Sequence, residues 1–187
     1  MANAADSLKS PSGAQADYED GKRFLEKNEL SQAAVAFHNA LLAYEEKGDE
    51  KGIANACHQL GHVCLARQEF GQAEKHYLRA RQLCEKFADP ASLAALSKKM
   101  VEVYRGLERY DMAVASCLEL VDGYMANNDP RGTVAILEIL AEVYIDAAKP
   151  AQAADAYRTI ASIHRNYKHA SIADSYEKKA AELAGNI

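Results

Sequence analysis

The sequence predicts an all-α fold: an α-solenoid of four helix-turn-helix repeats, closed by a C-terminal capping helix. Three observations carry this prediction. Helical apolar spacing runs almost without a break, and no stretch alternates with the period of two that a β-strand needs. One small residue returns every 40 positions, at Ala33, Ala73, Ala113 and Ala153. The breaks are periodic too, at Asp49, Asp89 and Asp129. A fixed period of this size is typical of stacked helical repeats.

The helices follow from these breaks in order. Residues 1–13 are small and polar and predict a flexible leader. The pairs Asp89-Pro90 and Asp129-Pro130 suit an N-cap followed by proline in the first helical turn. Helix pairs are predicted at 14–27 and 30–47, 50–67 and 70–88, 90–106 and 110–127, and 130–147 and 150–166. The repeats then span 14–49, 50–89, 90–129 and 130–168, so that 14–166 is the helical array. Residues 169–187 form the capping helix, near 169–184, and a tail.

Composition limits the class of function. The net charge is −5 with both signs interspersed, and no basic stripe suggests a nucleic-acid surface. No run approaches the ~18 apolar residues that cross a bilayer, and no secretory signal opens the chain. We therefore expect a cytoplasmic protein that binds neither nucleic acid nor membrane. The four cysteines lack the close pairing of a zinc site and are expected to be reduced thiols.

The repeats resemble the tetratricopeptide repeat. That family places a small residue and then an aromatic on the first helix, and a small, an aromatic and a small residue on the second. Two repeats follow this pattern closely, with Gly21, Phe24, Ala33, Phe37 and Ala40, and with Gly61, Cys64, Ala73, Tyr77 and Ala80. Two are looser, with Val101, Tyr104, Ala113, Cys117 and Leu120, and with Ala141, Tyr144, Ala153, Tyr157 and Ile160.

Two departures from the family pattern concern the subfamily. The period of 40 exceeds the family's usual ~34, and it is similar to the longer-repeat branch typified by kinesin light chain and some regulators of G-protein signalling. The family's tryptophan position is held by Asp17, Cys57, Ser97 and Leu137, and the chain contains no Trp. The resemblance implies a right-handed solenoid that serves as a protein-interaction scaffold or adaptor. Its first helices would line a concave groove, with the second helices behind them.

Carried onto this chain, the groove positions follow one turn apart on each first helix. They are Tyr18 and Lys22 (with Gln15), Asn55, His58 and His62, Lys98, Glu102 and Arg105, and Glu138 and Glu142. Donors come early and carboxylates late, which predicts a partner segment of mixed charge. The alternative is that these are ordinary solvated helix faces. The cluster that grips chaperone tails in this family is not reproduced, because Tyr18, Lys22, Ala95 and Lys99 stand at its positions.

Other residue types invite rival interpretations. His58 and His62 lie four apart and could hold a metal together with Cys57 and His76, but no carboxylate accompanies them at fixed spacing, and we expect no metal. No phosphate loop, serine elbow or other catalytic motif is present, so neither an enzyme nor a cofactor is expected. Self-assembly remains an alternative function. The first helix of the fourth pair is unusually apolar, with Ile136, Ile139, Val143 and Ile145. Either the capping helix or a second subunit would cover it.

Overall fold

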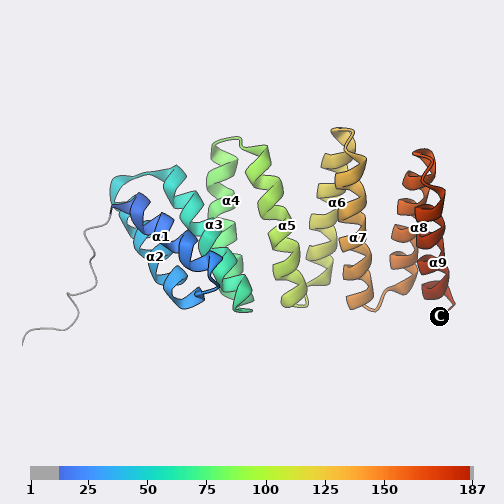
Figure 1. The fold of residues 1–187 in the computed structure, drawn as a ribbon, viewed down its shortest axis with the longest axis horizontal. Coiled ribbons are helices and arrows are strands. Elements are labelled where there is room, and N and C mark those ends of the chain that lie inside the picture. Colours follow the sequence, from blue (N-terminus) through green and yellow to red (C-terminus); the bar gives the residue numbers. More distant parts are fainter. Residues whose placement is uncertain (1–12, 186–187) are drawn as a thin grey trace, which may run out of the picture. The chain divides into compact units, whose positions relative to one another are not determined.

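The computed structural model describes residues 13–185, and over this range the chain forms nine α-helices and no β-strand (Figure 1). They are α1 (Ala14–Glu26), α2 (Leu30–Lys47), α3 (Glu50–Ala66), α4 (Phe70–Lys86), α5 (Pro90–Gly106), α6 (Tyr110–Ala126), α7 (Pro130–Asp146), α8 (Pro150–Asn166) and α9 (Ala170–Ala184). Each begins and ends within two residues of its predicted position. Apart from Gly13, the predicted leader lies outside the described residues. The all-α helical repeat architecture is confirmed.

The chain divides into two compact units, and the division falls between Asp89 and Pro90, where the second predicted repeat ends. Unit 1 holds α1 to α4 and unit 2 holds α5 to α9. Within each unit every helix packs on the next one in the chain. The predicted capping helix α9 packs on α8.

A shorter period underlies the 40-residue repeat. A residue with positive φ ends a helix at every twentieth position from 28 to 168, with φ between 51° and 66°. At each of these turns a backbone N–H donates to the carbonyl five residues earlier, as Asp49 does to Tyr44 at 2.9 Å. This is the Schellman bond, which satisfies carbonyls left over at a helix end. Asp49 and Asp129 then cap the next helix, accepting from the N–H groups of Gly52 and Gly132 at 3.0 and 2.9 Å.

Small residues lie where helices approach most closely. Ala33, Ala73, Ala113 and Ala153 each have no exposed surface. Four glycines lie against aromatic rings so closely that an added Cβ would overlap the ring. Gly21 meets Phe37 and Gly61 meets Tyr77 within a helix pair, whereas Gly52 meets Tyr44 and Gly132 meets Tyr124 between successive pairs. The repeated small positions therefore set the helix spacing, as overpacking there would force the helices apart.

Candidate functional site

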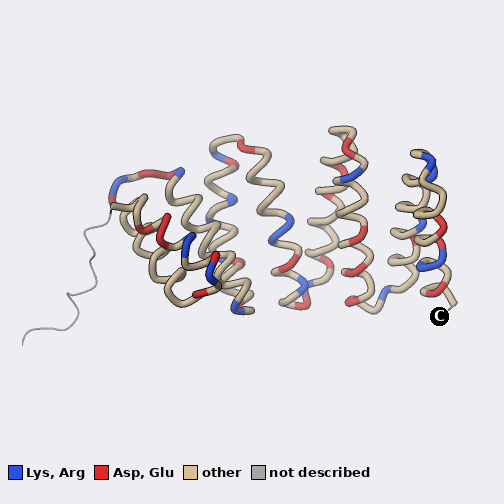
Figure 2. Tube along the Cα trace, viewed as in Figure 1, with Lys and Arg blue, Asp and Glu red and all other residues tan. Residues whose placement is uncertain are grey.

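The ten predicted groove residues lie on α1, α3, α5 and α7, which are the first helices of the pairs. Five belong to unit 1 and five to unit 2, so each unit presents its own first-helix face. In both units Lys and Arg are intermixed with Asp and Glu, as Figure 2 shows. We describe the two faces separately.

On α1, the predicted groove residues also bind the neighbouring helices. The ring of Tyr18 packs edge-on against Phe37 of α2, with centroids 5.6 Å apart, and its hydroxyl accepts a hydrogen bond from Gln59 Nε2 of α3 at 3.4 Å. Lys22 Nζ pairs with Glu19 at 3.0 Å, and this hydrogen bond raises the pKa of the ammonium. Tyr18 therefore serves the packing of α1 as well as lining its surface.

The centre of the unit 1 face is a histidine pair on α3. Nε2 of His58 lies 3.1 Å from Nε2 of His62, and the two rings stack with an interplanar angle of 12°. A hydrogen bond between them requires one ring to donate and the other to accept. Both rings also pack edge-to-face with the buried Tyr77 ring, at centroid distances of 5.9 Å. Asn55 is exposed one turn earlier. The result is a planar, polar and half-buried surface held in place by an aromatic core residue.

Of the four side chains in the alternative metal site, the structure brings the imidazoles of His58 and His62 together. Cys57, adjacent to His58 in sequence, is fully buried, and burial raises the pKa of its thiol to about 11. A protonated thiol is a poor metal ligand. Over residues 13–185, no three His, Cys, Asp or Glu side chains are arranged to hold a metal ion.

On unit 2, two predicted groove residues pair with each other. Arg105 of α5 donates from Nη1 to Glu142 Oε2 at 3.0 Å and from Nε to Asp146 Oδ2 at 2.9 Å, both on α7. Burial lowers the pKa of this guanidinium, but the hydrogen bonds to the two carboxylates outweigh burial and raise it overall. One cation faces two anions, so this part of the surface is net negative. Asp146 was missed by sequence reasoning, although it lies one turn after Glu142.

The other three predicted residues of unit 2 also have partners within the unit. Lys98 Nζ lies 5.0 Å from the ring centroid of Tyr124 on α6, a cation–π contact. Glu102 pairs with Lys99 Nζ at 2.7 Å. Glu138 accepts a hydrogen bond from the hydroxyl of Tyr176 on α9. Helix α9 thus contacts α7. Comparison of equivalent repeat positions could not identify Tyr176 as part of this surface, because α9 has no equivalent in the other repeats.

Comparison with known proteins agrees with this architecture. Residues 56–91 match the family model described as Tetratricopeptide repeat. No curated protein matches the sequence. No helix among the described residues is long and apolar enough to cross a membrane.

Solved structures with the same fold cover nearly the whole chain. The apo form of RapI is 12% identical, with a TM-score of 0.68 over 93% of this chain and 54% of RapI, so the chain spans about half the length of that protein. A Podosopora anserina protein described as a putative kinesin light chain with nearly identical TPR-like repeats is 13% identical, with a TM-score of 0.51 over 96% of this chain and 98% of that one. A singly substituted form of that protein is also 13% identical, with a TM-score of 0.50 and coverages of 92% and 94%. At these identities the likeness is one of fold.

Proposed function

We propose that this chain, which has a tetratricopeptide-like fold and matches that family's model over residues 56–91, is an adaptor that binds a peptide segment of another protein on its first-helix faces. The fold itself indicates a protein-interaction scaffold, since stacked repeats present extended binding surfaces. The adaptor acts without a cofactor or catalytic chemistry of its own, in the cytoplasm.

The observation that supports this proposal best is the α3 face of unit 1. The stacked imidazoles of His58 and His62 pack against the Tyr77 ring, which restricts their rotation, and Asn55 is exposed one turn before them. An amide and imidazoles can both donate to and accept from a peptide backbone. Because the rings are already ordered, binding loses little side-chain entropy.

On unit 2 the ion pairs change which residues are suitable contacts. Arg105 and Glu142 are engaged with each other, so a partner would have to displace that pair to use either charge. Lys98 instead makes a single cation–π contact and Glu102 a single ion pair within unit 2. A partner could therefore contact these two side chains without breaking a network of two ion pairs. We therefore assign the partner contacts on unit 2 to Lys98 and Glu102 first, with Glu138 beside Tyr176.

A photo-crosslinking residue at Asn55 tests the proposal, with the same residue at Gln72 as the matched control. Both positions are exposed, but Gln72 lies on α4, a second helix. We expect one partner protein to crosslink from position 55 and not from 72, and its capture to fall when His62 is replaced by Ala. Equal crosslinking from both positions would contradict binding at the first-helix face. Charge reversal at Arg105 would be a poor test of partner binding, because Arg105→Glu would place a third carboxylate beside Glu142 and Asp146 and so disturb unit 2 itself.

Self-assembly is the second candidate, and one observation favours it. Ile145 on α7 is 44% exposed, and Ile139 on the same helix is half-buried. Exposed aliphatic side chains on the last pair suit contact with a second copy. Sedimentation over a range of concentrations distinguishes the two: a dimer that Ile145→Lys dissociates would favour self-assembly over the adaptor role.

A further inference from the structure

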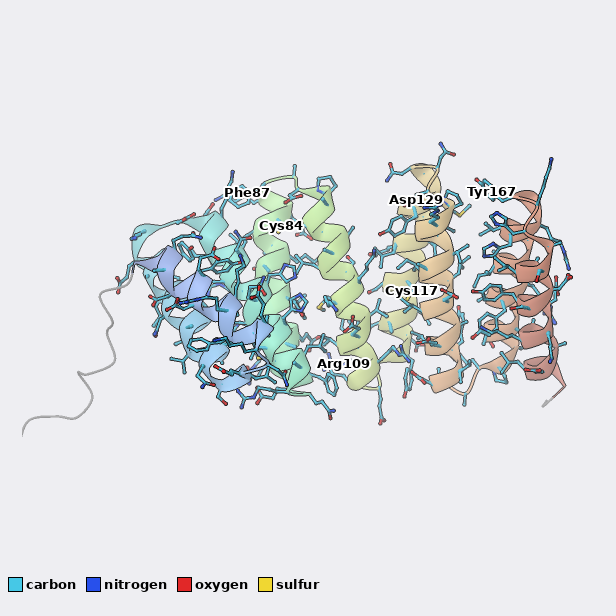
Figure 3. All side chains as sticks on the ribbon, viewed as in Figure 1. Cys84, Phe87, Arg109, Cys117, Asp129 and Tyr167 are labelled. Atoms are coloured by element: carbon cyan, nitrogen blue, oxygen red, sulfur yellow. The ribbon has the colours of Figure 1, made fainter. Side chains whose placement is uncertain are left out.

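Unit 2 contains an apolar cavity of about 300 Å³ between α6, α7 and α8, which we call the α6–α8 cavity. Val121, Leu137 and Ile163, one from each helix, form its apolar walls. Two further lining residues are largely exposed, Met125 at 61% and Tyr167 at 56%. In Figure 3 the labelled Asp129 and Tyr167 lie toward the same end of the helices of this unit. None of the predicted groove residues lines the cavity.

The corresponding position in unit 1, 80 residues earlier, is crossed by ion pairs. Arg79 Nη2 on α4 pairs with Glu45 Oε1 on α2 at 2.6 Å. Lys86 Nζ on α4 pairs with Glu50 of α3, also at 2.6 Å. These long side chains bridge α2, α3 and α4, and the charges of Arg79 and Glu45 both act on the thiol of the fully buried Cys57. In unit 1 this junction is therefore closed by charge pairs.

The equivalent residues of unit 2 cannot make those bridges. Met125 stands where Glu45 would fall, and Thr159 where Arg79 would fall. For the second ion pair, Pro130 stands where Glu50 would fall and Asn166 where Lys86 would fall. The Thr159 hydroxyl donates to the carbonyl of Asp155 in its own helix at 2.9 Å, so it turns back toward α8 rather than spanning the junction. The same framework thus carries an apolar opening in place of two ion pairs.

The charge at the opening has one sign. Among the described residues, Asp129 is the only charged one that lines the cavity. One of its oxygens, Oδ1, caps α7 by accepting from Gly132 N. Because Asp129 is half-buried beside apolar side chains, its carboxylate attracts a cation more strongly than it would in bulk water. The cavity therefore combines an apolar interior with a preference for positive charge at its edge.

We propose that the α6–α8 cavity binds one large apolar side chain of a partner protein that carries a basic residue beside it. The volume is at the lower end of the ~300–1,000 Å³ range of ligand sites, which suits a single side chain such as Phe. A protein partner is favoured because Met125 and Tyr167 extend the apolar surface beyond the cavity, and aromatic residues and Met are enriched at the centres of protein interfaces. This site is separate from the first-helix faces.

Three tripeptides test the chemistry on the full chain: acetyl-Lys-Phe-Lys-amide, its counterpart with Glu at both flanks, and its counterpart with Ala at the centre. Binding is followed by the NMR signal of the Met125 methyl group. We expect the Lys-Phe-Lys peptide to shift this signal, and the Ala peptide to bind about tenfold more weakly or worse, since it buries no ring. Asp129→Asn keeps a good helix cap while removing the charge, and should abolish the preference for Lys over Glu.

Closing the cavity provides the decisive comparison. Thr159→Phe fills it without adding charge, and Ser162→Phe, exposed on the same helix and outside the lining, is the matched control. The double variant M125E/T159R instead transplants the ion pair of unit 1. Because this variant lacks the Met125 methyl group, its binding is followed by the ring proton signals of the Phe in the peptide, which are recorded for the wild type as well. We expect both closing changes to abolish peptide binding and Ser162→Phe to retain it, with circular dichroism verifying that each variant folds.

Several results would overturn the proposal. They are no Met125 shift at the highest soluble peptide concentration, equal binding of the Ala peptide, and unchanged binding to Thr159→Phe. A concentration-dependent dimer that Thr159→Phe dissociates would also overturn it, because the cavity would then receive a second copy of this chain.

Discussion

Replacing Gly61 by Ala tests whether close helix contact sets the spacing of the repeats. A Cβ at position 61 would lie 2.5, 2.7 and 2.8 Å from Cε1, Cδ1 and Cζ of Tyr77. Carbon atoms in contact normally stand about 3.5–4.0 Å apart, so the ring would have to move by about 1 Å. Tyr77 is fully buried and packs edge-to-face with His58 and His62, so its ring has little room to move away.

The expected cost follows from two opposing terms. Overpacking a core position costs about 1–3 kcal/mol. Exchanging glycine for alanine inside a helix returns up to about 1 kcal/mol. The free energy of unfolding of Gly61→Ala should therefore fall by roughly 0–2 kcal/mol, and should lie about 1–3 kcal/mol below that of a Gly→Ala change that meets no side chain. Gly71 is exposed on α4 of the same unit, and a Cβ added there would have nothing within 4 Å, so Gly71→Ala should show no loss.

Urea unfolding followed by circular dichroism at 222 nm measures both variants, with unchanged slopes as the check that stability alone has changed. A double-mutant cycle with Tyr77→Leu then isolates the ring as the cause. In the Tyr77→Leu background the substitution at position 61 should cost less, because the ring atoms it meets are gone. If it costs as much there as in the wild type, or if the Gly61 and Gly71 variants are equally stable, steric contact with Tyr77 is not what keeps position 61 small.

Three further expectations concern the turns and the titratable groups. Ala148 has φ 54°, a conformation that favours glycine, so Ala148→Gly should raise the free energy of unfolding in urea by about 0.5–1 kcal/mol. Burial and then neighbouring basic groups lower the pKa of His76 below 6.5, so the unfolded chain takes up its proton more readily. The melting temperature should therefore fall as pH drops through 6.5, and less so in His76→Gln. Burial, and then Glu138, raise the pKa of Tyr176 to about 12, so Glu138→Gln should shift its phenolate absorbance titration toward 10.

The sequence predicted the helix pairs well because close packing constrains residue type strongly. Ala33 and its three equivalents are fully buried between helices, so their size is fixed and their period is visible. The 20-residue period of the turns was hidden for the opposite reason. Only Gly48 among those left-handed positions is glycine, while residues such as Ala88 and Lys168 adopt the same φ without a distinctive residue type. The Schellman bond is made by backbone atoms and leaves little trace in the side chains.

The candidate site was only partly accessible from sequence. Equivalent positions on each helix identified which residues share the first-helix face, because helical spacing determines that. The pairing of Arg105 with Glu142 depends instead on the Arg105 side chain of α5 reaching α7, 37 positions further along the chain. Reasoning one helix at a time treats these two as separate ligand contacts. In a chain with a 40-residue period, a side chain on one first helix can reach residues about 40 positions later, on the next first helix. A search for opposite charges at that separation would have found the pair.

Equivalent positions of the repeats differ in how freely their residue types can vary. Positions that touch a neighbouring helix, such as Gly61 and Ala73, cannot vary without moving the helices. Positions at the junction of three helices tolerate different solutions, because either an ion pair or apolar side chains can occupy the same framework. Glu45 with Arg79, and Met125 with Thr159, are two such solutions at one register. Partner selection in this chain is therefore expected to reside where equivalent repeats differ, and the α6–α8 cavity is such a place.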